Sequence, residues 1–401
     1  MPPADSATAP IRVARIITRL NIGGPAIQAI EMSARLESMG CQTLLIHGRL
    51  GPGEGDMGYR VPPDRRFEMA YVPALRRELA PAADVAAVAR VFRLLCRFRP
   101  TIVHTHTAKA GTVGRAAALL YNASAGRHAP ARLVHTYHGH VLEGYFAAWR
   151  TRGFTATERA LGRRTDALIA VSSRIRRDLL ERYRIGTAAR FHVVPLGFDL
   201  SPFASLGPAD RLAARAALGL DPNARVAALV GRLTTIKQPE LFIEAADRIA
   251  SVDQRARFLV AGGGELEAAL RATTAARDLS DRVRFLGWQR DVSAIYAASD
   301  VVVVTSRNEG TPVALIEGMA AGVPGVCFAV GGVPDVILAP DLGVLVPEGD
   351  VDALAAAIQQ LFDDDRRRAD MGARARPSVV ERFAVDRLVR DLAALYRQLV
   401  S

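Results

Sequence analysis

The first half of the chain alternates short apolar runs with segments in which apolar residues recur every three or four positions. The short runs predict buried strands, and the longer segments, such as 25–39 and 84–98, predict helices. Strands that alternate with helices are typical of a parallel sheet covered on both faces. The expected strands are 11–20, 43–47, 101–104, 133–138 and 167–171.

A second series of the same kind begins after residue 195. Between the two series, the segment 196–222 is rich in proline and glycine and predicts a linker, with one helix inside it at 210–218. Two doubly wound α/β domains joined by a linker present the carboxyl ends of their strands to a cleft, where we expect the ligand. The strands of the second series are expected at 226–230, 257–261, 283–286, 301–305, 325–328 and 343–346.

Composition agrees with two globular domains. Half of the 401 residues are hydrophobic and 23% are charged, which excludes a wholly disordered chain. The three cysteines, Cys41, Cys96 and Cys327, lie far apart, so neither a disulfide framework nor a thiolate zinc site is expected. The amino-terminal residues have no signal-peptide core, and no apolar run reaches the ~18 residues of a membrane span. A cytoplasmic protein is the expectation.

The formal net charge of +11 is concentrated in one stretch. Residues 140–190 contain 11 Arg and 5 Asp or Glu, and they contribute +6. Within 145–164, Tyr145, Phe146, Trp149 and Phe154 are interleaved with arginines, which fits either a face for anionic lipid headgroups on the inner side of the cell membrane or an amphipathic helix with its aromatic residues in the core. No nucleic-acid-binding motif accompanies the charge, so we do not expect a nucleic-acid partner.

A strand-to-helix turn carries the most informative residues. The apolar strand 301–305 is followed by the sequence 308–317, NEGTPVALIE. Thr311 is a good N-cap and Pro312 a good first residue, so a helix is expected to begin there with its free N–H groups at the cleft. Such a helix end binds a diphosphate well.

Two glutamates flank this helix start. Glu309 lies in the loop, and Glu317 lies about a turn and a half inside the helix, so the two cannot share one proton. A separated pair suits an elongated ligand, with Glu309 near a sugar and Glu317 on ribose hydroxyls. Glu317 interrupts an apolar run, which argues against a simple surface position.

A second turn carries two cations. The strand 226–230 ends in Gly231, and Arg232 and Lys237 follow before a helix that opens at Pro239. Cations at the carboxyl end of a strand face the cleft and can neutralise a departing diphosphate, with Arg as a fork and Lys as a point charge. A metal ion is then not required, and we expect neither a metal nor another cofactor. Asp350 and Asp352 look like the start of a helix and not like metal ligands.

The amino-terminal domain offers weaker chemical signals. Gly23 and Gly24 join a strand to a helix, where glycine lets backbone N–H groups approach an anion or a sugar, although a plain tight turn explains them almost as well. Several histidines occur at alternate positions, but without a third ligand type they favour hydrogen-bonding residues over a zinc site. His138 is the one expected at the cleft, because it ends a strand just before Gly139.

These residues resemble the family 4 retaining glycosyltransferases, also called glycosyltransferase group 1, which have the GT-B fold. The resemblance covers nearly the whole chain and is most specific at 309–317, which looks like the family's EGxPxxxxE region, and in its continuation at 319–324 and 331–335. It implies two Rossmann-like doubly wound parallel-sheet domains that face a central cleft. The acceptor-binding domain would be 1–197 and the donor-binding domain 198–380, with a last helix at 381–401 packing back on the first domain.

The resemblance also assigns roles. It implies that Glu309 and His138 lie beside the sugar, that Glu317 binds ribose, and that Arg232 and Lys237 bind phosphate. The segment 287–291 would border the nucleobase. The implied catalytic residues are His138, Arg232, Lys237 and Glu309, and the implied donor-binding residues are Gly23, Gly24, Gly231, Gln289, Arg290, Gly310, Thr311, Pro312, Val313 and Glu317.

The implied activity is that of a retaining, metal-independent hexosyltransferase. The donor would be a nucleotide diphosphate sugar, most often a UDP-sugar in this family, and the acceptor a sugar or a lipid-linked sugar in bacterial surface polysaccharide or glycolipid synthesis. Two alternatives stay open. One is a nucleotide-sugar epimerase of the same architecture, whose acidic residues we cannot identify in the sequence. The other is a non-catalytic nucleotide-sugar binding subunit.

Overall fold

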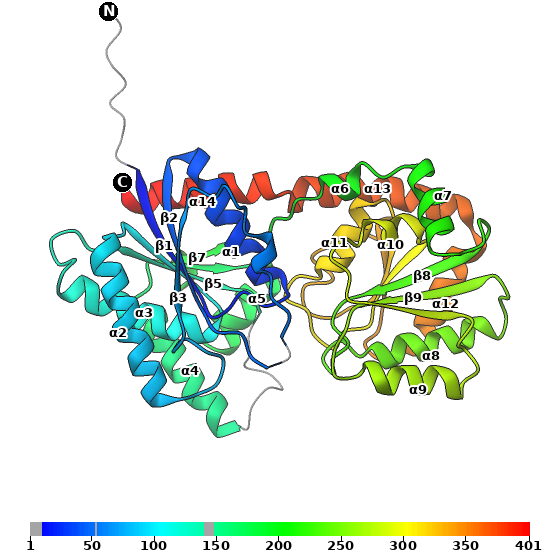
Figure 1. Cartoon of the computed structure of the whole chain (residues 1–401), viewed down its shortest axis with the longest axis horizontal. Helices are drawn as coiled ribbons and strands as arrows, with labels where there is room; N and C mark the ends of the chain where they lie inside the picture. The colour runs from blue at the N-terminus through cyan, green and yellow to red at the C-terminus, as the bar shows by residue number, and fades with distance from the viewer. Residues whose placement is uncertain (1–9, 53, 140–147) are drawn as a thin grey trace, which may run out of the picture. The chain divides into compact units, whose positions relative to one another are not determined.

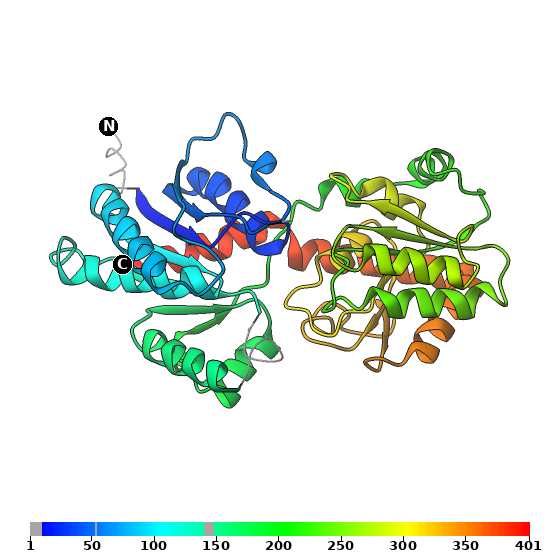
Figure 2. The same ribbon diagram turned by 60° about the horizontal axis from the view of Figure 1, so that its bottom comes forward.

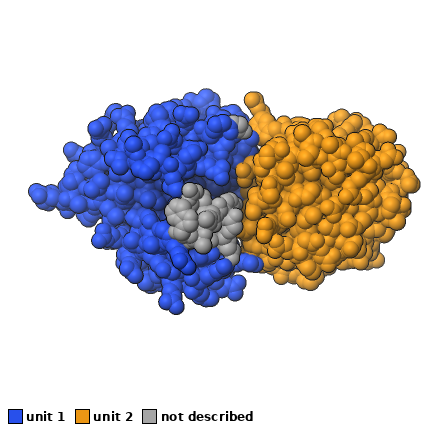
Figure 3. Space-filling view, turned by 90° about the horizontal axis from the view of Figure 1, so that it is seen from below, with its two compact units in different colours: residues 1–198, 385–401 blue, residues 199–384 orange. Residues whose placement is uncertain are grey.

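The chain forms two compact units in the computed structural model, which describes residues 10–52, 54–139 and 148–401 (Figure 1). Unit 1 comprises 1–198 and 385–401, and unit 2 comprises 199–384 (Figure 3). The expected boundary at 197/198 lies one residue from the observed one. The expected boundary at 380/381 is wrong, because one helix continues to Phe383 and the chain enters unit 1 only at Val385, whose N–H donates to the carbonyl of Phe198.

Unit 1 is built on a seven-stranded parallel sheet in the order β3-β2-β1-β4-β5-β6-β7. The inner strands are largely buried on both faces because helices cover both sides, as the all-buried β6 illustrates. The strands are β1 Ile11–Ile17, β2 Cys41–Gly48, β3 Glu68–Val72, β4 Ile102–His106, β5 Arg132–Tyr137, β6 Ala167–Ala170 and β7 Phe191–Val193.

The last helix of the chain belongs to the core of unit 1. Helix α14 places Leu388, Leu392 and Tyr396 against residues of β1, β4, β5 and β6. The resemblance implied a last helix on the first domain from residue 381, whereas α14 begins at Val385. The helices of unit 1 are α1 Gly24–Arg35, α2 Pro81–Phe98, α3 Ala108–Ala123, α4 Ala148–Gly162, α5 Ser173–Arg177 and α14 Val385–Val400, with a 3-10 turn at Leu36–Met39 and a π-turn at Asp178–Arg182.

Unit 2 repeats the design with a six-stranded parallel sheet in the order β10-β9-β8-β11-β12-β13. Figures 1 and 2 show α8 and α9 on one side of this sheet and α10 and α11 on the other. The strands are β8 Arg225–Val230, β9 Ala256–Ala261, β10 Val283–Gly287, β11 Val301–Val304, β12 Gly325–Phe328 and β13 Gly343–Val346. The helices are α6 Ser201–Ala204, α7 Pro208–Ala217, α8 Pro239–Ala250, α9 Glu267–Ala276, α10 Ser293–Ala298, α11 Val313–Ala320, α12 Val351–Asp363 and α13 Asp365–Phe383.

The segment expected as a linker is instead part of unit 2 from residue 199 onward. Helix α7 packs on α10, and Arg211 and Arg215 bind the buried carboxylate of Asp300 at 2.6 and 2.8 Å. Buried acidic groups are held in this way because an unpaired charge in the interior is costly. The prolines and glycines of this segment lie at the ends of α6 and α7, and they do not form a flexible linker.

Two strands were missed by the sequence analysis, and one helix end was predicted well. β3 and β7 are edge strands with exposed positions, so their apolar pattern is weak. The acidic segment after residue 349 does start a helix, because the Asp350 side chain accepts from the N–H of Ala353 at 2.9 Å. Among the described residues, no helix is both long enough and apolar enough to span a membrane.

Candidate active site

The carboxyl edge of the unit 2 sheet joins two loops that the sequence analysis singled out. β8 and β11 are neighbours, so the loop after Val230 and the loop after Val304 leave the sheet side by side. Two hydrogen bonds connect them. The Thr305 hydroxyl donates to the carbonyl of Lys237 at 3.0 Å, and the N–H of Arg307 donates to the carbonyl of Ile236 at 2.9 Å.

Lys237 and Glu309 meet directly across these loops. The ammonium of Lys237 lies 2.5 Å from Oε1 of Glu309, and the Ser306 hydroxyl donates to the same oxygen at 2.5 Å. Glu309 is only 8% exposed, so these two donors compensate for the loss of water around its carboxylate. Lys237 has three N–H donors and uses one here, which leaves capacity for an anionic ligand.

Arg232 lies at the opening of the same loop, and its side chain is exposed. Its guanidinium forms no hydrogen bond or ion pair with any described residue. The backbone beside it is unusually close to the next strand, because a Cβ at Gly262 would lie 1.8 Å from the carbonyl oxygen of Gly231. Only glycine fits at 262. The glycine run 262–264 after β9 was the signal for this contact, and the sequence analysis did not use it.

A second glycine pair packs against the Glu309 loop. The N–H of Gly332 donates to the carbonyl of Glu309 at 2.8 Å. A Cβ at Gly331 would lie 2.0 Å from that carbonyl oxygen, and a Cβ at Gly332 would lie 2.3 Å from the carbonyl oxygen of Gly310. The resemblance included this glycine segment, and the contacts give its physical reason: it holds the main chain of Glu309 and Gly310 in place.

Helix α11 begins one residue later than expected. Pro312 has non-helical backbone angles and is the N-cap, Val313 is the first helical residue, and no side chain caps the helix. The prediction that Thr311 is the N-cap and Pro312 the first residue is therefore wrong. The first N–H groups of a helix have no acceptor within the helix. The start of α11, shortly after Gly310 in the sequence, therefore still offers backbone donors.

Glu317 lies on the second turn of α11 and is half-buried. Its Oε2 accepts a hydrogen bond from the Tyr296 hydroxyl on α10 at 3.0 Å. Burial and the neighbouring carboxylate raise the pKa of Tyr296 well above its usual value, so this hydroxyl remains a donor. Tyr296 was missed because nothing in a sequence connects α10 to α11 before the fold is known.

Gln289 and Arg290 lie on the exposed loop after β10, the outermost strand of the unit 2 sheet. Two strands, β9 and β8, separate β10 from β11, and the Gln289 amide donates to the carbonyl of Leu286 at 2.6 Å. The structure therefore does not bring these two residues into the cluster formed by Lys237 and Glu309. Their nucleobase role stays a prediction.

In unit 1, the glycines and the candidate histidine follow different strands. Gly23 is the N-cap of α1 with a φ of 152°, and Gly24 is its first residue, so this helix also begins without a side-chain cap. His138 comes directly after β5 and not at its end, half-buried, with its Nε2 3.0 Å from Nδ1 of His106. Burial lowers the pKa of His138 to about 3, so its imidazole is neutral. Within the described part of the chain, no cluster of three or more metal-ligating side chains occurs.

The basic stretch is only partly visible, since Tyr145 and Phe146 and the side chain of Trp149 lie outside the described residues. In helix α4, Glu158 is buried and binds Arg115 at 2.6 and 2.8 Å, whereas Arg152 is exposed. Arg163 and Arg164, directly after the helix, are also exposed.

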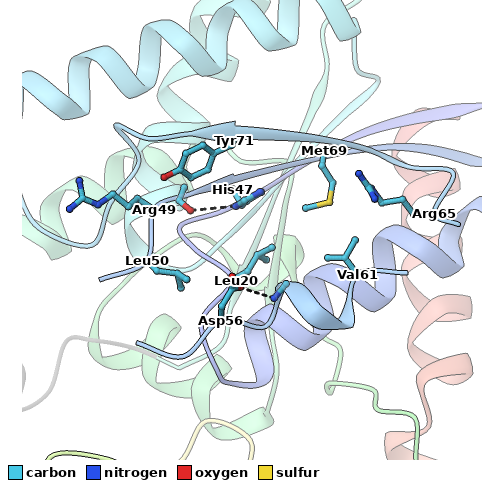
Figure 4. Close-up of a pocket in the computed structure, with 11 residues that line it drawn as sticks. Leu20, His47, Arg49, Leu50, Asp56, Val61, Arg65, Met69 and Tyr71 are labelled. Atoms are coloured by element: carbon cyan, nitrogen blue, oxygen red, sulfur yellow. Dashed lines mark hydrogen bonds between the residues drawn. The ribbon is translucent and has the colours of Figure 1, made fainter. Parts of the chain in front are cut away.

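A cavity of about 550 Å³ lies in unit 1 beside the carboxyl end of β2 (Figure 4). His47 and Tyr71 line it from the strands, and Asp56, which accepts from the N–H of Gly58 at 2.7 Å, lines it from the loop. Burial lowers the pKa of His47, so the imidazole is uncharged near neutral pH. The remaining lining residues are Leu20, Gly48, Arg49, Leu50, Gly58, Val61, Arg65 and Met69.

Comparison with known proteins identifies the family. A model described as glycosyl transferases group 1 matches residues 210–377, and one described as glycosyltransferase family 4 matches 22–202. A D-inositol 3-phosphate glycosyltransferase of Xylanimonas cellulosilytica is 31% identical over 318 residues, which cover 74% of this chain and 72% of the relative. The chain belongs to the group 1, family 4 glycosyltransferases.

Other relatives of this glycosyltransferase agree. The Escherichia coli UDP-Gal:alpha-D-GlcNAc-diphosphoundecaprenol alpha-1,3-galactosyltransferase is 28% identical over 333 residues, which cover 82% of this chain and 84% of the relative. The structure of Anabaena Alr3699/HepE in complex with UDP-glucose superposes with a TM-score of 0.79 over 96% of this chain and 99% of that one, at 21% identity. This similarity confirms the predicted GT-B fold.

Proposed function

We propose that this glycosyltransferase moves a hexose from a nucleotide diphosphate sugar to an acceptor hydroxyl, with retention of the anomeric configuration and without a metal ion. The observation that carries the proposal is the Lys237–Glu309 ion pair at the carboxyl edge of the unit 2 sheet, with the exposed Arg232 on the same loop as Lys237 and α11 beginning shortly after Glu309. The site combines cations, a desolvated carboxylate and free backbone N–H groups, which together suit a sugar diphosphate.

The proposed reaction breaks the bond between the anomeric carbon and the phosphate oxygen and forms one from that carbon to the acceptor oxygen on the same face. The acceptor's proton passes to the leaving phosphate. Arg232 and Lys237 stabilise the negative charge that develops on the diphosphate, with the helix end behind Gly310. Glu309 accepts hydrogen bonds from sugar hydroxyls, and it keeps Lys237 oriented toward the phosphate.

For the donor we propose a UDP-sugar. The support is the similarity to the E. coli enzyme, whose name gives UDP-Gal as donor, and to the HepE complex with UDP-glucose. Glu317 would hold the ribose, since its half-buried carboxylate is already oriented by Tyr296. Gln289, Arg290, Gly231, Thr311, Pro312 and Val313 would complete the donor site in unit 2, and the role of Gly23 and Gly24 as donor-binding residues stays a prediction.

For the acceptor we propose a sugar, free or lipid-linked, bound by unit 1. The cavity beside β2 supports this because its lining combines apolar side chains such as Leu50 and Met69 with polar ones such as His47 and Asp56. That mixture suits a sugar ring, which has an apolar face and a polar rim. The names of the relatives, with diphosphoundecaprenol and inositol phosphate acceptors, support a role in surface polysaccharide or glycolipid synthesis.

We also propose contact with an anionic membrane surface at the cytoplasmic side. The exposed Arg152 of α4, with the exposed Arg163 and Arg164 directly after the helix, supports it, because each basic side chain near an anionic bilayer contributes roughly 1 kcal/mol. Co-sedimentation with vesicles of phosphatidylglycerol and phosphatidylcholine tests this. We expect binding that falls as salt rises, and no binding to phosphatidylcholine alone; equal recovery with both vesicles would reject the proposal.

The activity is tested by incubating the enzyme with UDP-glucose, UDP-galactose or GDP-mannose, a short-chain lipid diphosphate sugar and EDTA, followed by NMR of the product. We expect one donor to yield a new α-glycosidic bond from its α-linked sugar. A β-linked product would contradict retention, and a requirement for added divalent metal would contradict metal independence. Release of nucleotide with an epimerised free sugar would favour the epimerase.

A further inference from the structure

Unit 1 buries an arginine that has no acidic partner. Arg15, on β1, is fully buried, and no carboxylate of the described residues pairs with it. Its guanidinium instead lies 2.9 Å from Nε2 of His106 through Nη1 and 3.1 Å from the Tyr396 hydroxyl through Nη2. A buried charge without a counter-charge costs folding free energy, so stability alone does not account for this arginine.

The arginine determines which nitrogen of His106 carries the proton. A guanidinium can only donate, so Nε2 of His106 must accept and the proton of this neutral imidazole must sit on Nδ1. Nδ1 lies 3.0 Å from Nε2 of His138 and therefore donates to it. The same logic then leaves the proton of His138 on its own Nδ1.

Both imidazoles are neutral, which the direction of these bonds requires. Burial lowers the pKa of His106 well below its usual value, and the positive charge of Arg15 and the neighbouring histidines lower it further. His138 is affected by burial and by Arg15 in the same way. A doubly protonated ring would have to donate toward another donor, so the only consistent arrangement is the one set by Arg15.

The other terminal nitrogen of the guanidinium, Nη2, forms the hydrogen bond that holds Arg15 in place. The Tyr396 hydroxyl accepts from Arg15, so its own hydrogen is directed to Nδ1 of His104 at 2.5 Å. Nε2 of His104 then donates to the Thr136 hydroxyl at 2.7 Å. Because Tyr396 lies on α14, the last helix of the chain supplies one of the two acceptors that orient the guanidinium.

The hydrogen-bond chain from Arg15 through His106 ends at the Nδ1–H of His138, which is a donor without an acceptor. Nδ1 of His138 lies below the surface and has no hydrogen-bond partner among residues 10–52, 54–139 and 148–401. A buried N–H left unpaired costs folding free energy, so such a group points to an oxygen that a ligand brings. His138 is also the residue that the resemblance puts beside the transferred sugar.

We propose that Arg15 is a positioning residue that acts through His106 to hold His138 in the Nδ1-protonated form, which donates a hydrogen bond to a hydroxyl of the sugar substrate. The identity of the ligand rests on the proposed function. The direction of the relay, from Arg15 to His106 to His138, does not, because it follows from the contacts alone.

Long-range 1H–15N spectra of histidine-labelled protein test the relay without any substrate. The signals of His138 are assigned by their loss in His138→Asn. We expect a protonated Nδ1 and a bare Nε2 on His138 in the wild type, retained in Arg15→Lys and lost or mixed in Arg15→Met. Arg12→Met, on the same strand, is the control and should leave the spectrum unchanged. A wild-type His138 protonated on Nε2 overturns the proposal, even where a variant does not fold.

Kinetics then connect the relay to the sugar. We expect Arg15→Met to lower kcat/KM for the donor about tenfold in the wild-type background and by less than twofold in the His138→Ala background, with near recovery in Arg15→Lys. Equal losses in both backgrounds would show that Arg15 acts only through the fold. If no sugar is transferred by any variant while the spectra behave as expected, the proposed function fails and the relay stands.

Discussion

The carboxyl edges of the two sheets use ionisable groups in opposite ways. In unit 2, Lys237 and Glu309 are charged and paired, and Arg232 is exposed nearby. In unit 1, burial and the positive charge of Arg15 keep the imidazoles of His106 and His138 neutral. Two scaffolds of the same kind therefore present different chemistry at the equivalent edge.

This difference is informative about ligands. Charged side chains at the rim can redirect their hydrogen bonds to a diphosphate, so the unit 2 edge suits a group that gains charge during the reaction. A chain of neutral histidines fixes the direction of each hydrogen bond and suits an uncharged hydroxyl. The predictions below test whether each edge depends on the feature assigned to it, beginning with the largest expected effect.

The largest effect should come from removing the carboxylate that pairs with a buried arginine in unit 1. Glu158→Ala leaves the guanidinium of Arg115, whose side chain is 1% exposed, without its carboxylate, so we expect a loss of about 3–5 kcal/mol in the free energy of unfolding. Arg15→Met should cost far less, since it removes a charge that has no partner. Glu31→Ala, at a surface pair with Arg35, is the control, with an expected loss below about 0.5 kcal/mol in urea titrations. Similar losses for Glu158→Ala and Arg15→Met would contradict the contrast between the two arginines.

In unit 2, Glu309→Gln should abolish most of the turnover while leaving the fold intact. The variant loses the charge that orients Lys237, and we expect kcat to fall about 100-fold, which corresponds to roughly 2.7 kcal/mol. Glu348→Gln, an exposed glutamate on another loop, should keep wild-type activity. A Glu309→Gln enzyme within threefold of the wild type would remove this carboxylate from the site.

Acidification should destabilise unit 1 between pH 7 and 5. The folded pKa values of His104, His106, His135 and His138 lie below the unfolded value of about 6.5, so the unfolded chain binds more protons as pH falls. Their contribution is fully present above pH 6.5 and is lost below it, at up to about 1.4 kcal/mol per pH unit for each histidine.

The control for this pH effect is the exposed His128. Urea titrations at several pH values should show a shallower slope in His135→Asn and an unchanged slope in His128→Asn. Stability that does not vary over this range would mean that the four histidines bind protons as readily in the folded protein as in the unfolded chain.

The smallest effect concerns the hydrogen bond that orients the proposed ribose ligand. Tyr296→Phe removes the donor to Glu317 and should weaken nucleotide-sugar binding about fivefold, or roughly 1 kcal/mol, with little change in kcat. Tyr59→Phe, at an exposed tyrosine of unit 1, should not alter the affinity. A larger effect on kcat than on affinity would place Tyr296 in the chemical step.

Much of the fold follows from the sequence because its signals are local. Continuous apolar runs such as 301–304 identify inner parallel strands, and Asp350 identifies a helix start. The edge strands β3 and β7 lack that signal, because one side of each faces no neighbouring strand. Thr311 was misplaced as an N-cap because Pro312 has non-helical backbone angles and takes that position itself, without a side-chain cap.

The site shows the same division. Lys237 and Glu309 lie on loops whose motifs can be recognised in the sequence, and their contact follows from the adjacency of β8 and β11. Arg15 and Tyr396 are separated by 381 positions and meet only because α14 returns to unit 1. No local pattern marks Arg15 as different from the other arginines, so its role could be found only from the three-dimensional contacts.

The account's central claim is that the carboxyl edge of unit 2 binds a nucleotide diphosphate sugar without a metal. Calorimetric titration of UDP-glucose and GDP-mannose in EDTA, into the wild type and Glu317→Gln, tests it most directly. We predict that the wild type binds at least one of them, and that the variant binds it about 10–100-fold more weakly because charge-assisted hydrogen bonds to the ribose are lost. Binding that appears only with divalent metal, or equal binding by both proteins, would contradict the claim.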